Sequence, residues 1–250
     1  MITAVIITHN EERNIGRCLE SLKGVADEVV VVDSGSTDGT EAICRRHGVH
    51  FVHHQWKDYS DQKNYANSLA TGDWILSIDA DEALSPRLRD SLLTLKQSGL
   101  NASTAYSFNR LTNYCGHWIR HCGWYPDRCT RLFRTGTMQW DGVVHEQLVG
   151  TDTNPTVSWI KGDLLHYSYY SVEEHASRNV KYAMLAAEKA HAAGRRSSTA
   201  TIVLKTSWSF IRGYLLRGGF LDGAAGFTVC KVAAFYTMLK YTRLKELNMS

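Results

Sequence analysis

Two hydrophobic patterns alternate over the first 100 residues. Four short runs rich in Val and Ile predict β-strands, at residues 2–8, 28–33, 49–53 and 74–79. Four intervening segments carry helical spacing or capping residues, at residues 12–23, 40–47, 61–70 and 86–97. The run 28–33 has no polar alternation, as expected of a parallel strand that is covered on both faces. Strands that alternate with helices at this spacing predict an α/β fold with a mostly parallel sheet.

Polar residues follow three of the predicted strands. Thr8 follows the first strand, Asp33 the second, and Asp79 and Asp81 the fourth. Ligands of such sheets bind beyond the carboxyl ends of the strands, so we expect these residues to share one crevice. Asp79, Asp81 and Glu82 place three like charges within four residues, which predicts a cation beside them. The alternatives are a simple turn at Asp33 and capping of the next helix by the acids.

Composition narrows the class of protein. The chain has 250 residues, of which 44% are hydrophobic and 10% aromatic, so it is long and apolar enough to bury a sizeable core. Its first residues lack a basic segment and read as a β-strand, not as a signal peptide. Six cysteines without an export signal favour free thiols and a cytoplasmic location.

Four motifs occur in a characteristic order: ITHNEERNI, VVVVDSGSTDGT, SDQKNYAN and GDWILSIDADE. In this order they resemble the nucleotide-sugar-binding half of a family 2 glycosyltransferase with the GT-A fold, a Rossmann-like sheet flanked by helices. The resemblance implies a catalytic domain over residues 1–170, with a donor half (1–100) and an acceptor half (101–170). It also implies a Mg²⁺ or Mn²⁺ ion and inverting glycosyl transfer. The chain has no phosphate-binding P-loop motif.

The same resemblance implies roles for individual donor-site residues. Thr8 and Asp33 match positions that contact the base and the ribose, and Lys63 matches a basic position near the nucleotide. Asp79 matches the ribose-side acid of the DxD motif, and Asp81 matches the acid that binds the metal. Hard oxygen ligands suit Mg²⁺ or Mn²⁺, which agrees with this assignment.

The second half brings candidates for acceptor binding. The segment WIRHCGWYPD, followed by RLFR and VHEQL, resembles the bacterial lipopolysaccharide-core glucosyltransferases. Aromatic and cationic side chains suit sugar rings and phosphates, and the candidates here are Trp124, Tyr125, Arg131 and His145. The alternative is a loop whose aromatic residues only pack against the sheet.

Inverting transfer requires a general base that takes the proton of the acceptor hydroxyl. The resemblance assigns this role to Glu146, and a salt bridge to Arg131 or Arg134 is the alternative. His166 is a candidate nitrogen ligand of the metal, and a histidine hydrogen-bonded to the backbone is the alternative. Glu82 is expected to support the neighbouring acids or to cap a helix.

The C-terminal region, residues 171–250, is predicted to be helical, apolar and basic. Residues 199–250 contain seven Lys and Arg against two acids, a net charge of +5. Charged residues interrupt every long apolar run, which disfavours a membrane-spanning helix. Two helices separated at residues 217–219 suit the surface of an anionic membrane. The alternatives are packing on the catalytic domain or on a second subunit, as in a homo-oligomer. Nucleic acid binding is disfavoured because the charges are interleaved with apolar residues.

These features favour an inverting glycosyltransferase at the inner face of the cytoplasmic membrane. Its donor would be a UDP-hexose, with glucose favoured, and its acceptor a lipid-anchored glycan such as lipopolysaccharide core. Within enzymes, the alternative acceptors are a polyprenyl phosphate, a capsule glycan or a protein. From another class, the alternative is a non-catalytic nucleotide-binding regulatory module.

Overall fold

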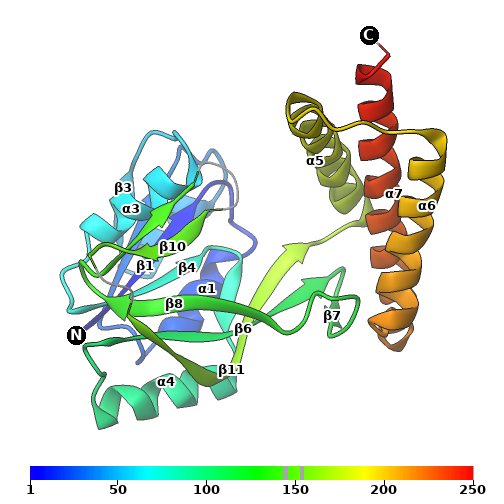
Figure 1. The fold of residues 1–250 in the computed structure, drawn as a ribbon. Coiled ribbons are helices and arrows are strands. Elements are labelled where there is room, and N and C mark those ends of the chain that lie inside the picture. The colour runs from blue at the N-terminus through cyan, green and yellow to red at the C-terminus, as the bar shows by residue number, and fades with distance from the viewer. Residues whose placement is uncertain (143–145, 153–154, 250) are drawn as a thin grey trace. The chain divides into compact units, whose positions relative to one another are not determined.

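The computed structural model describes residues 1–142, 146–152 and 155–249. The chain divides into two compact units (Figure 1). The first, here called the sheet unit, consists of residues 1–110 and 127–166. The second, the helical unit, consists of residues 111–126 and 167–250, so the segment 111–126 groups with the C-terminal helices.

Four parallel strands form the N-terminal part of the sheet in the order β3-β2-β1-β4. They are β1 (Ile2–Thr8), β2 (Glu28–Asp33), β3 (His50–His53) and β4 (Trp74–Asp79). The register places Thr8 of β1 beside Asp33 of β2, and Ile7 of β1 beside Asp79 of β4. The polar residues at these strand ends therefore meet at one edge of the sheet, and the prediction of an α/β fold is confirmed.

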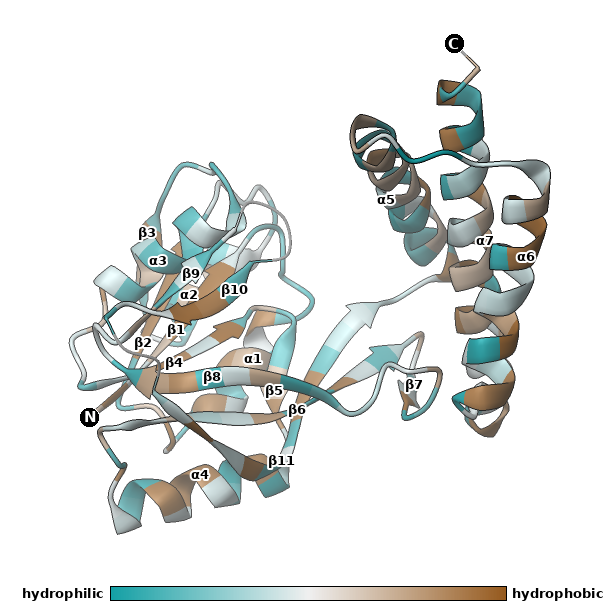
Figure 2. Ribbon diagram, viewed as in Figure 1, coloured by the Kyte–Doolittle hydropathy of each residue, from teal (hydrophilic) through white to brown (hydrophobic). Residues whose placement is uncertain are grey.

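Helices cover both faces of this parallel sheet. They are α1 (Ile15–Leu22), α2 (Thr40–Arg46), α3 (Tyr59–Ser68) and α4 (Pro86–Ser98). Alternate residues of β1 point to opposite faces, so Ile6 packs in one core cluster with α1 and α4, whereas Val5 packs in another with Ala66 of α3. Figure 2 shows hydrophobic residues along these central strands. Ser85 caps α4, its hydroxyl accepting a hydrogen bond from the Leu88 amide.

Antiparallel strands complete the sheet in the order β4-β8-β6-β11-β5. They are β5 (Glu82–Leu84), β6 (Thr104–Tyr114), β8 (Asp127–Arg134) and β11 (Thr156–Tyr169). A separate hairpin pairs β9 (Met138–Asp141) with β10 (Gln147–Gly150). Pairing of β4 with β8, and of β5 with β11, brings residues 50 to 85 positions away in the chain to the acidic strand end.

The helical unit is built on three helices and a short strand. These are β7 (His117–Ile119), α5 (Val172–Ala192), α6 (Thr199–Ile211) and α7 (Gly223–Leu247). A π-helical turn, η1 (Arg212–Leu216), and a 3₁₀ turn, η2 (Gly219–Asp222), connect α6 to α7. A Cβ atom at Gly226 would lie 2.0 Å from the Gly219 carbonyl oxygen, so this approach requires glycine.

A buried carboxylate fastens the helical turn to the β7 loop. Asp222 accepts hydrogen bonds from the amides of Arg120 and His121, and its Oδ1 lies 2.9 Å from His121 Nδ1. Beside it, Cys122 and Cys230 are buried together with Val229 in one apolar cluster. Within the described residues, no helix combines the length and apolar character that crossing a membrane requires.

Candidate functional site

The site lies where the parallel strands of the sheet unit end. Thr8 is buried, and its hydroxyl has no hydrogen-bond partner within the described residues. Next to it, Asp33 is fully buried at the end of β2. An unpaired buried hydroxyl has a desolvation cost that a ligand at this edge could recover.

Asp33 organises the turn that follows β2. Its Oδ2 accepts hydrogen bonds from the Gly35 amide at 2.9 Å and the Ser36 amide at 2.8 Å, and its Oδ1 accepts one from the Ser36 hydroxyl. His53 Nδ1 lies 3.2 Å from Asp33 Oδ2. The structure therefore shows the turn role of Asp33, and its role toward a ligand stays a prediction.

A buried network of charges surrounds Asp79 at the end of β4. Lys63 Nζ of α3 lies 3.0 Å from Asp79 Oδ1, and Arg131 Nη2 of β8 lies 3.2 Å from Asp79 Oδ2. Arg131 Nη2 also lies 3.0 Å from Glu82 Oε1, and Glu82 Oε2 accepts the Asp79 amide at 2.9 Å. Glu82 therefore supports the neighbouring acid Asp79 through a hydrogen bond, as expected from the sequence. Arg131 is buried between the carboxylates of Asp79 and Glu82.

The charges of this network shift the ionisation of its members. Burial alone would raise the pKa of Asp79, but the charges of Lys63 and Arg131 outweigh it and hold that pKa well below its usual range. Burial likewise opposes the charge on Arg131, but Glu82 and Asp79 outweigh it and raise the pKa of its guanidinium. Paired charges of this kind are held in fixed positions, which is what a binding site for a polyanion requires.

Lys63 also connects the network to Glu146. Lys63 Nζ lies 3.1 Å from Glu146 Oε1, and the Lys63 side chain is almost fully buried whereas Glu146 is one-fifth exposed. The ring of Trp140 lies against the ammonium, with its centroid 4.4 Å from Nζ. The salt-bridge alternative for Glu146 named Arg131 or Arg134, but its partner is Lys63. One carboxylate thus remains accessible beside the buried network.

Asp81 and His166 form a second, adjacent pair. Asp81 lies in the turn between β4 and β5, and its Oδ2 is 3.1 Å from His166 Nε2. His166 is on β11 and pairs in register with Glu82 of β5, which accounts for its position. Burial would lower the pKa of His166, but the hydrogen bond and charge of Asp81 outweigh it and raise that pKa.

The donor atoms of this pair fit a divalent cation. Two ligands on adjacent corners of an octahedron, each about 2.1 Å from Mg²⁺, lie about 3.0 Å apart, and the observed separation is 3.1 Å. His166 Nδ1 is buried and has no hydrogen-bond partner within the described residues. Over residues 1–142, 146–152 and 155–249, no three His, Cys, Asp or Glu side chains are grouped to hold an ion by themselves. Water molecules and oxygen atoms of a bound phosphate would complete the coordination.

Two members of the site could not be foreseen from the sequence. Arg110 of β6 lies 2.8 Å from Asp127 and 3.6 Å from Glu82, which extends the network along the sheet. Trp140 is fixed by Asn64 of α3, whose side chain exchanges two hydrogen bonds of 2.8 Å with the Trp140 backbone. Both arrangements join residues far apart in the chain, and no local motif marks them.

The remaining acceptor candidates are distributed differently. Trp124 and Tyr125 belong to the helical unit, where Trp124 stacks edge-on against Tyr114 and His175. The Tyr125 ring lies 5.7 Å from the Arg120 guanidinium. His145 lies outside the described residues. Of the acceptor candidates, Arg131 is the one that the structure places in the sheet unit's charge network.

A comparison with sequence families decides the class of this protein. The sequence model described as "Glycosyl transferase family 2" matches residues 3–139, which include the acids of β4 and their partners on α3 and β8. The chain belongs to glycosyltransferase family 2. It is accordingly an enzyme of the glycosyltransferase class, and the prediction from the four motifs is confirmed.

Relatives extend this likeness over almost the whole chain. The lipopolysaccharide core biosynthesis glycosyltransferase LpsC of Rhizobium meliloti is 30% identical over 262 residues, covering 98% of this chain and 92% of the relative. A glycosyltransferase of Rickettsia felis is 31% identical over 253 residues, covering 98% of this chain and 89% of the relative. The resemblance to lipopolysaccharide-core enzymes therefore includes the C-terminal helices.

A solved structure shows the same fold. The mannosyltransferase PcManGT of Pyrobaculum calidifontis, determined with GDP-mannose and Mn²⁺, aligns with a TM-score of 0.54 and 14% identity. The alignment covers 97% of this chain and 86% of that protein. The expected GT-A architecture of this family 2 enzyme is confirmed.

Proposed function

We propose that this enzyme transfers a hexose, with glucose favoured, from a UDP-sugar to a lipid-anchored bacterial glycan with inversion at the anomeric carbon. The observation that carries the proposal is the accessible Glu146 carboxylate, held 3.1 Å from Lys63, which in turn contacts the strand-end acid Asp79. In this proposal Glu146 is the base for the acceptor and Lys63 the cationic partner of the donor, and both belong to the sheet unit. The likeness to LpsC supports a lipopolysaccharide-core acceptor.

In this proposal the donor lies at the carboxyl ends of β1, β2 and β4. Thr8 and Asp33 contact the base and ribose, and Asp79 faces the ribose side. Lys63 lies near the diphosphate, where its ammonium offsets negative charge. The unpaired Thr8 hydroxyl supplies a hydrogen-bonding group at this edge.

Asp81 and His166 would hold a Mg²⁺ or Mn²⁺ ion. Such an ion, when bound, neutralises the charge that develops on the departing nucleoside diphosphate. The 3.1 Å separation of Asp81 Oδ2 and His166 Nε2 and the unpaired His166 Nδ1 support this assignment. The Mn²⁺ in the PcManGT complex is a further argument.

The chemical step needs one base and one leaving group. The acceptor oxygen forms a bond to the anomeric carbon while the bond from that carbon to the phosphate oxygen breaks, and the nucleoside diphosphate leaves with the electron pair. Glu146 takes the acceptor hydroxyl proton. The ion pair with Lys63 orients the Glu146 carboxylate before the acceptor arrives.

The acceptor side of the proposal involves the helical unit. Trp124 and Tyr125 bind acceptor sugars, His145 and Arg131 are further candidates, and the C-terminal helices rest on the inner face of the cytoplasmic membrane. Contacts with Tyr114, Tyr169 and His175 hold the Trp124 ring in position.

A donor panel with defined metals tests the proposal. Thermal shift is measured with UDP-glucose, UDP-galactose and GDP-mannose, each with and without Mn²⁺, and the anomeric configuration of the product is read by NMR. We expect the largest Mn²⁺-dependent stabilisation with UDP-glucose, and a β-linked product from the α-linked donor. Asp81→Asn should abolish the Mn²⁺ increment but leave the metal-free shift unchanged.

Three results would contradict the proposal. A larger thermal shift with GDP-mannose than with UDP-glucose would show that the donor is not UDP-glucose. Retention of the anomeric configuration would exclude Glu146 as the base of a single-displacement reaction. A full Mn²⁺ increment in Asp81→Asn would remove this acid from the metal site. Asp90→Asn, at an exposed position of α4, is the matched control.

A further inference from the structure

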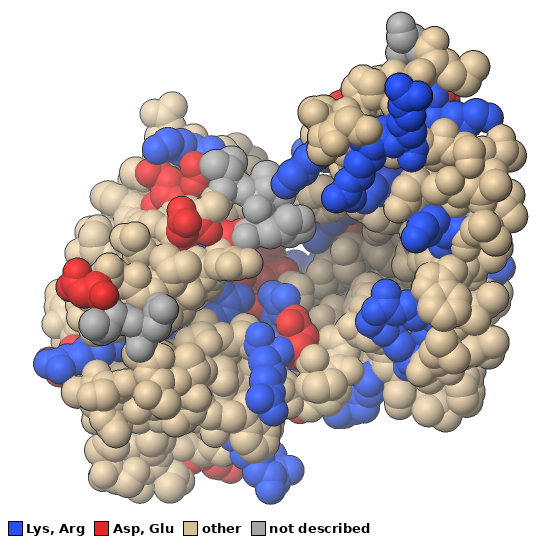
Figure 3. All heavy atoms as spheres, in the orientation of Figure 1, with Lys and Arg blue, Asp and Glu red and all other residues tan. Residues whose placement is uncertain are grey.

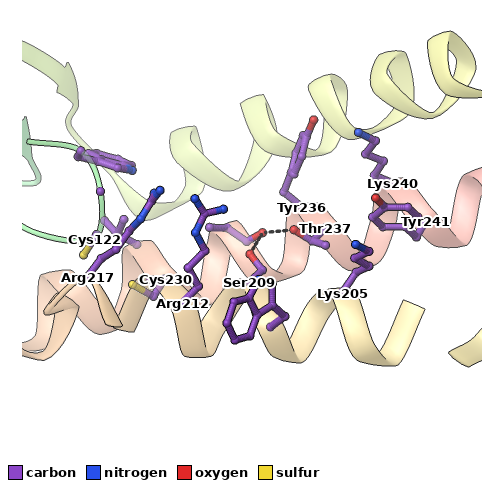
Figure 4. Close-up of a pocket in the computed structure, with 16 residues that line it drawn as sticks. Cys122, Lys205, Ser209, Arg212, Arg217, Cys230, Tyr236, Thr237, Lys240 and Tyr241 are labelled. Carbon is purple, nitrogen blue, oxygen red and sulfur yellow. Dashed lines mark hydrogen bonds between the residues drawn. The ribbon is translucent and has the colours of Figure 1, made fainter. Parts of the chain in front are cut away.

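A groove in the helical unit contains none of the proposed donor, metal or catalytic residues, and it shares Trp124 with the acceptor candidates. It has a volume of about 420 Å³ and is formed by α6, η1, α7 and the loop at residues 122–124 (Figure 4). All of its lining residues belong to the helical unit. The volume is within the range of small-molecule binding sites.

Four basic side chains line this groove: Lys205, Arg212, Arg217 and Lys240. Two come from α6 and its π-helical continuation, one ends that turn, and one lies on α7. None of the four forms an ion pair with a carboxylate of the described residues, whereas Arg178 and Arg243 of the same unit do. Four like charges that converge without a counter-charge favour an external anion.

The basic residues are arranged at two ends of the groove. Figure 4 shows Arg212 and Arg217 near Cys122, and Lys205 and Lys240 near Tyr241. Lys205 and Arg212 are seven residues apart on one continuous helical stretch, or about 10 Å at 1.5 Å per residue. The groove therefore presents two separate cationic positions, as an elongated anionic ligand would require.

Arg217 packs against the loop that contains Gly123. A Cβ atom at residue 123 would lie 2.2 Å from Arg217 Nη1, so Gly123 leaves the space that this guanidinium occupies. The Cys122 amide also donates to the Arg217 carbonyl at 3.1 Å, which fixes the loop against the turn. The absence of a side chain at Gly123 therefore leaves room for the Arg217 guanidinium at the groove.

Aromatic and apolar groups of the same elements suit a membrane surface. Trp208 and Tyr236 also line the groove, and Figure 4 shows Tyr236 between its two basic ends. Large apolar side chains that are half or more exposed occupy the turn between α6 and α7: Leu215, Leu216, Phe220 and Leu221. Figure 2 shows hydrophobic residues at this end of the helical hairpin. Exposed apolar residues beside cations are typical of proteins that insert into the headgroup layer.

We propose that this groove binds the phosphate group of an anionic lipid headgroup while the apolar turn enters the bilayer surface. Arg212 and Arg217, beside the turn, contact the phosphate nearest the membrane, and Lys205 and Lys240 contact a second anionic group of the same headgroup. The inference relies on the proposed function only for placing the helical unit at a membrane. Glycosyl transfer is not required for it.

Lipid binding by the full-length protein tests this site. Sedimentation is measured with vesicles of three parts phosphatidylcholine and one part cardiolipin, whose headgroup carries two phosphates, and with phosphatidylcholine alone. Glycerol 3-phosphate, titrated by calorimetry, represents a free phosphate monoester. We expect binding to the cardiolipin vesicles, and about thirtyfold weaker binding for either Arg212→Gln with Arg217→Gln or Lys205→Gln with Lys240→Gln.

A matched pair outside the groove separates a site from general attraction. Lys181→Gln with Lys189→Gln removes the same charge from exposed positions of α5, and we expect it to weaken binding by no more than about threefold. An equal loss in this control and in the groove pairs would overturn the site, as would vesicle binding that no pair weakens. Tight binding of glycerol 3-phosphate without vesicle binding would assign the groove to a free phosphate ligand and overturn the proposal of a lipid ligand.

All of these measurements are readouts of binding. If a groove variant loses vesicle binding but keeps donor binding, the result concerns the lipid site alone. If Glu146→Gln loses glycosyl transfer but binds vesicles normally, the result concerns the proposed function alone. Circular dichroism and melting of each variant check that the helices remain folded, and an unfolded pair is replaced by the single variant Arg217→Gln.

Discussion

The two units of this glycosyltransferase differ in whether their Lys and Arg side chains are paired with carboxylates. In the sheet unit, Lys63 and Arg131 are buried and each contacts two carboxylates. In the helical unit, the groove residues Lys205, Arg212, Arg217 and Lys240 have no carboxylate partner within the described chain. Figure 3 shows acidic and basic side chains close together in the sheet unit, and chiefly Lys and Arg on the same view of the helices.

This difference indicates what each unit requires from a ligand. Buried, paired charges are already in position, and the protein has met their desolvation cost in folding. Solvated, unpaired cations cost the fold little and keep their full interaction for an incoming anion. The comparison predicts large effects from substitutions in the sheet unit and small effects on stability from substitutions in the groove.

The largest effect is expected at the accessible end of the paired network. Glu146→Gln removes the proposed general base and should lower the transfer rate about a thousandfold, which corresponds to an increase of about 4 kcal/mol in activation free energy. Donor binding should persist in a thermal-shift measurement. The control is Glu188→Gln, an exposed acid of α5. A rate within about threefold of wild type would remove Glu146 from the chemistry.

The next effect concerns the buried arginine of the network. Arg131→Met leaves Glu82 and Asp79 buried without this partner, and breaking such a pair costs about 3 kcal/mol or more in unfolding free energy. Urea denaturation measures the loss. Arg128→Met, on the same strand but exposed, should change stability by less than about 0.5 kcal/mol. Equal stabilities of the two variants would show that the network is not needed for folding.

Lowering the pH should lower the stability of the helical unit because His175 is buried there in its neutral form. Burial, and to a lesser extent Arg178, lowers the pKa of this histidine to about 4, against about 6.5 in the unfolded chain. Below pH 6.5 the unfolded chain binds a proton that the folded chain does not, so stability is complete above pH 6.5 and falls as the pH approaches 4. The difference of about 2.5 units corresponds to about 3 kcal/mol.

Hydrogen exchange of α5 at pH 7 and pH 4.5 measures this loss. His175 Nδ1 lies 3.2 Å from the Tyr114 hydroxyl, and His175→Gln keeps a hydrogen-bonding group there without the titration. The variant should lose much of the pH dependence. If α5 is equally protected at both pH values in the wild-type protein, His175 is not buried in the neutral form.

The smallest effect is expected in the groove. Lys205→Gln with Lys240→Gln should change the unfolding free energy by no more than about 0.5 kcal/mol, because neither lysine is buried or forms an ion pair within the described residues. Urea denaturation measures the unfolding free energy of this double variant and of Arg131→Met under the same conditions. A loss of about 3 kcal/mol in the lysine pair would show that these cations have partners in the folded protein, and the contrast between the units would fail.

Local sequence pattern was sufficient for the parallel half of the fold. The runs that predicted strands at 2–8, 28–33 and 74–79 form β1, β2 and β4 with these bounds. Ser85 and Pro86 begin α4 as expected from their preference for the helix start. These features depend on neighbours in the chain, so a single sequence contains them.

The antiparallel half was much less visible in the sequence. The sequence pattern did not predict β8 or β11. Arg131 was expected near the acceptor, and its burial between Asp79 and Glu82 depends on the pairing of β8 with β4. Strand pairing over 50 or more residues is decided by the packing of the whole sheet, which no local pattern records.

The sequence by itself determined the class of the protein, because the acids after β4 and the order of the four motifs are local features that the family shares. Only the tertiary structure decided which charges are paired. Lys63 meets Glu146 across 83 positions, and the groove joins residues of α6 and α7 that are about 30 positions apart. Electrostatic interactions depend on distance and burial in the folded chain, and both are set by packing.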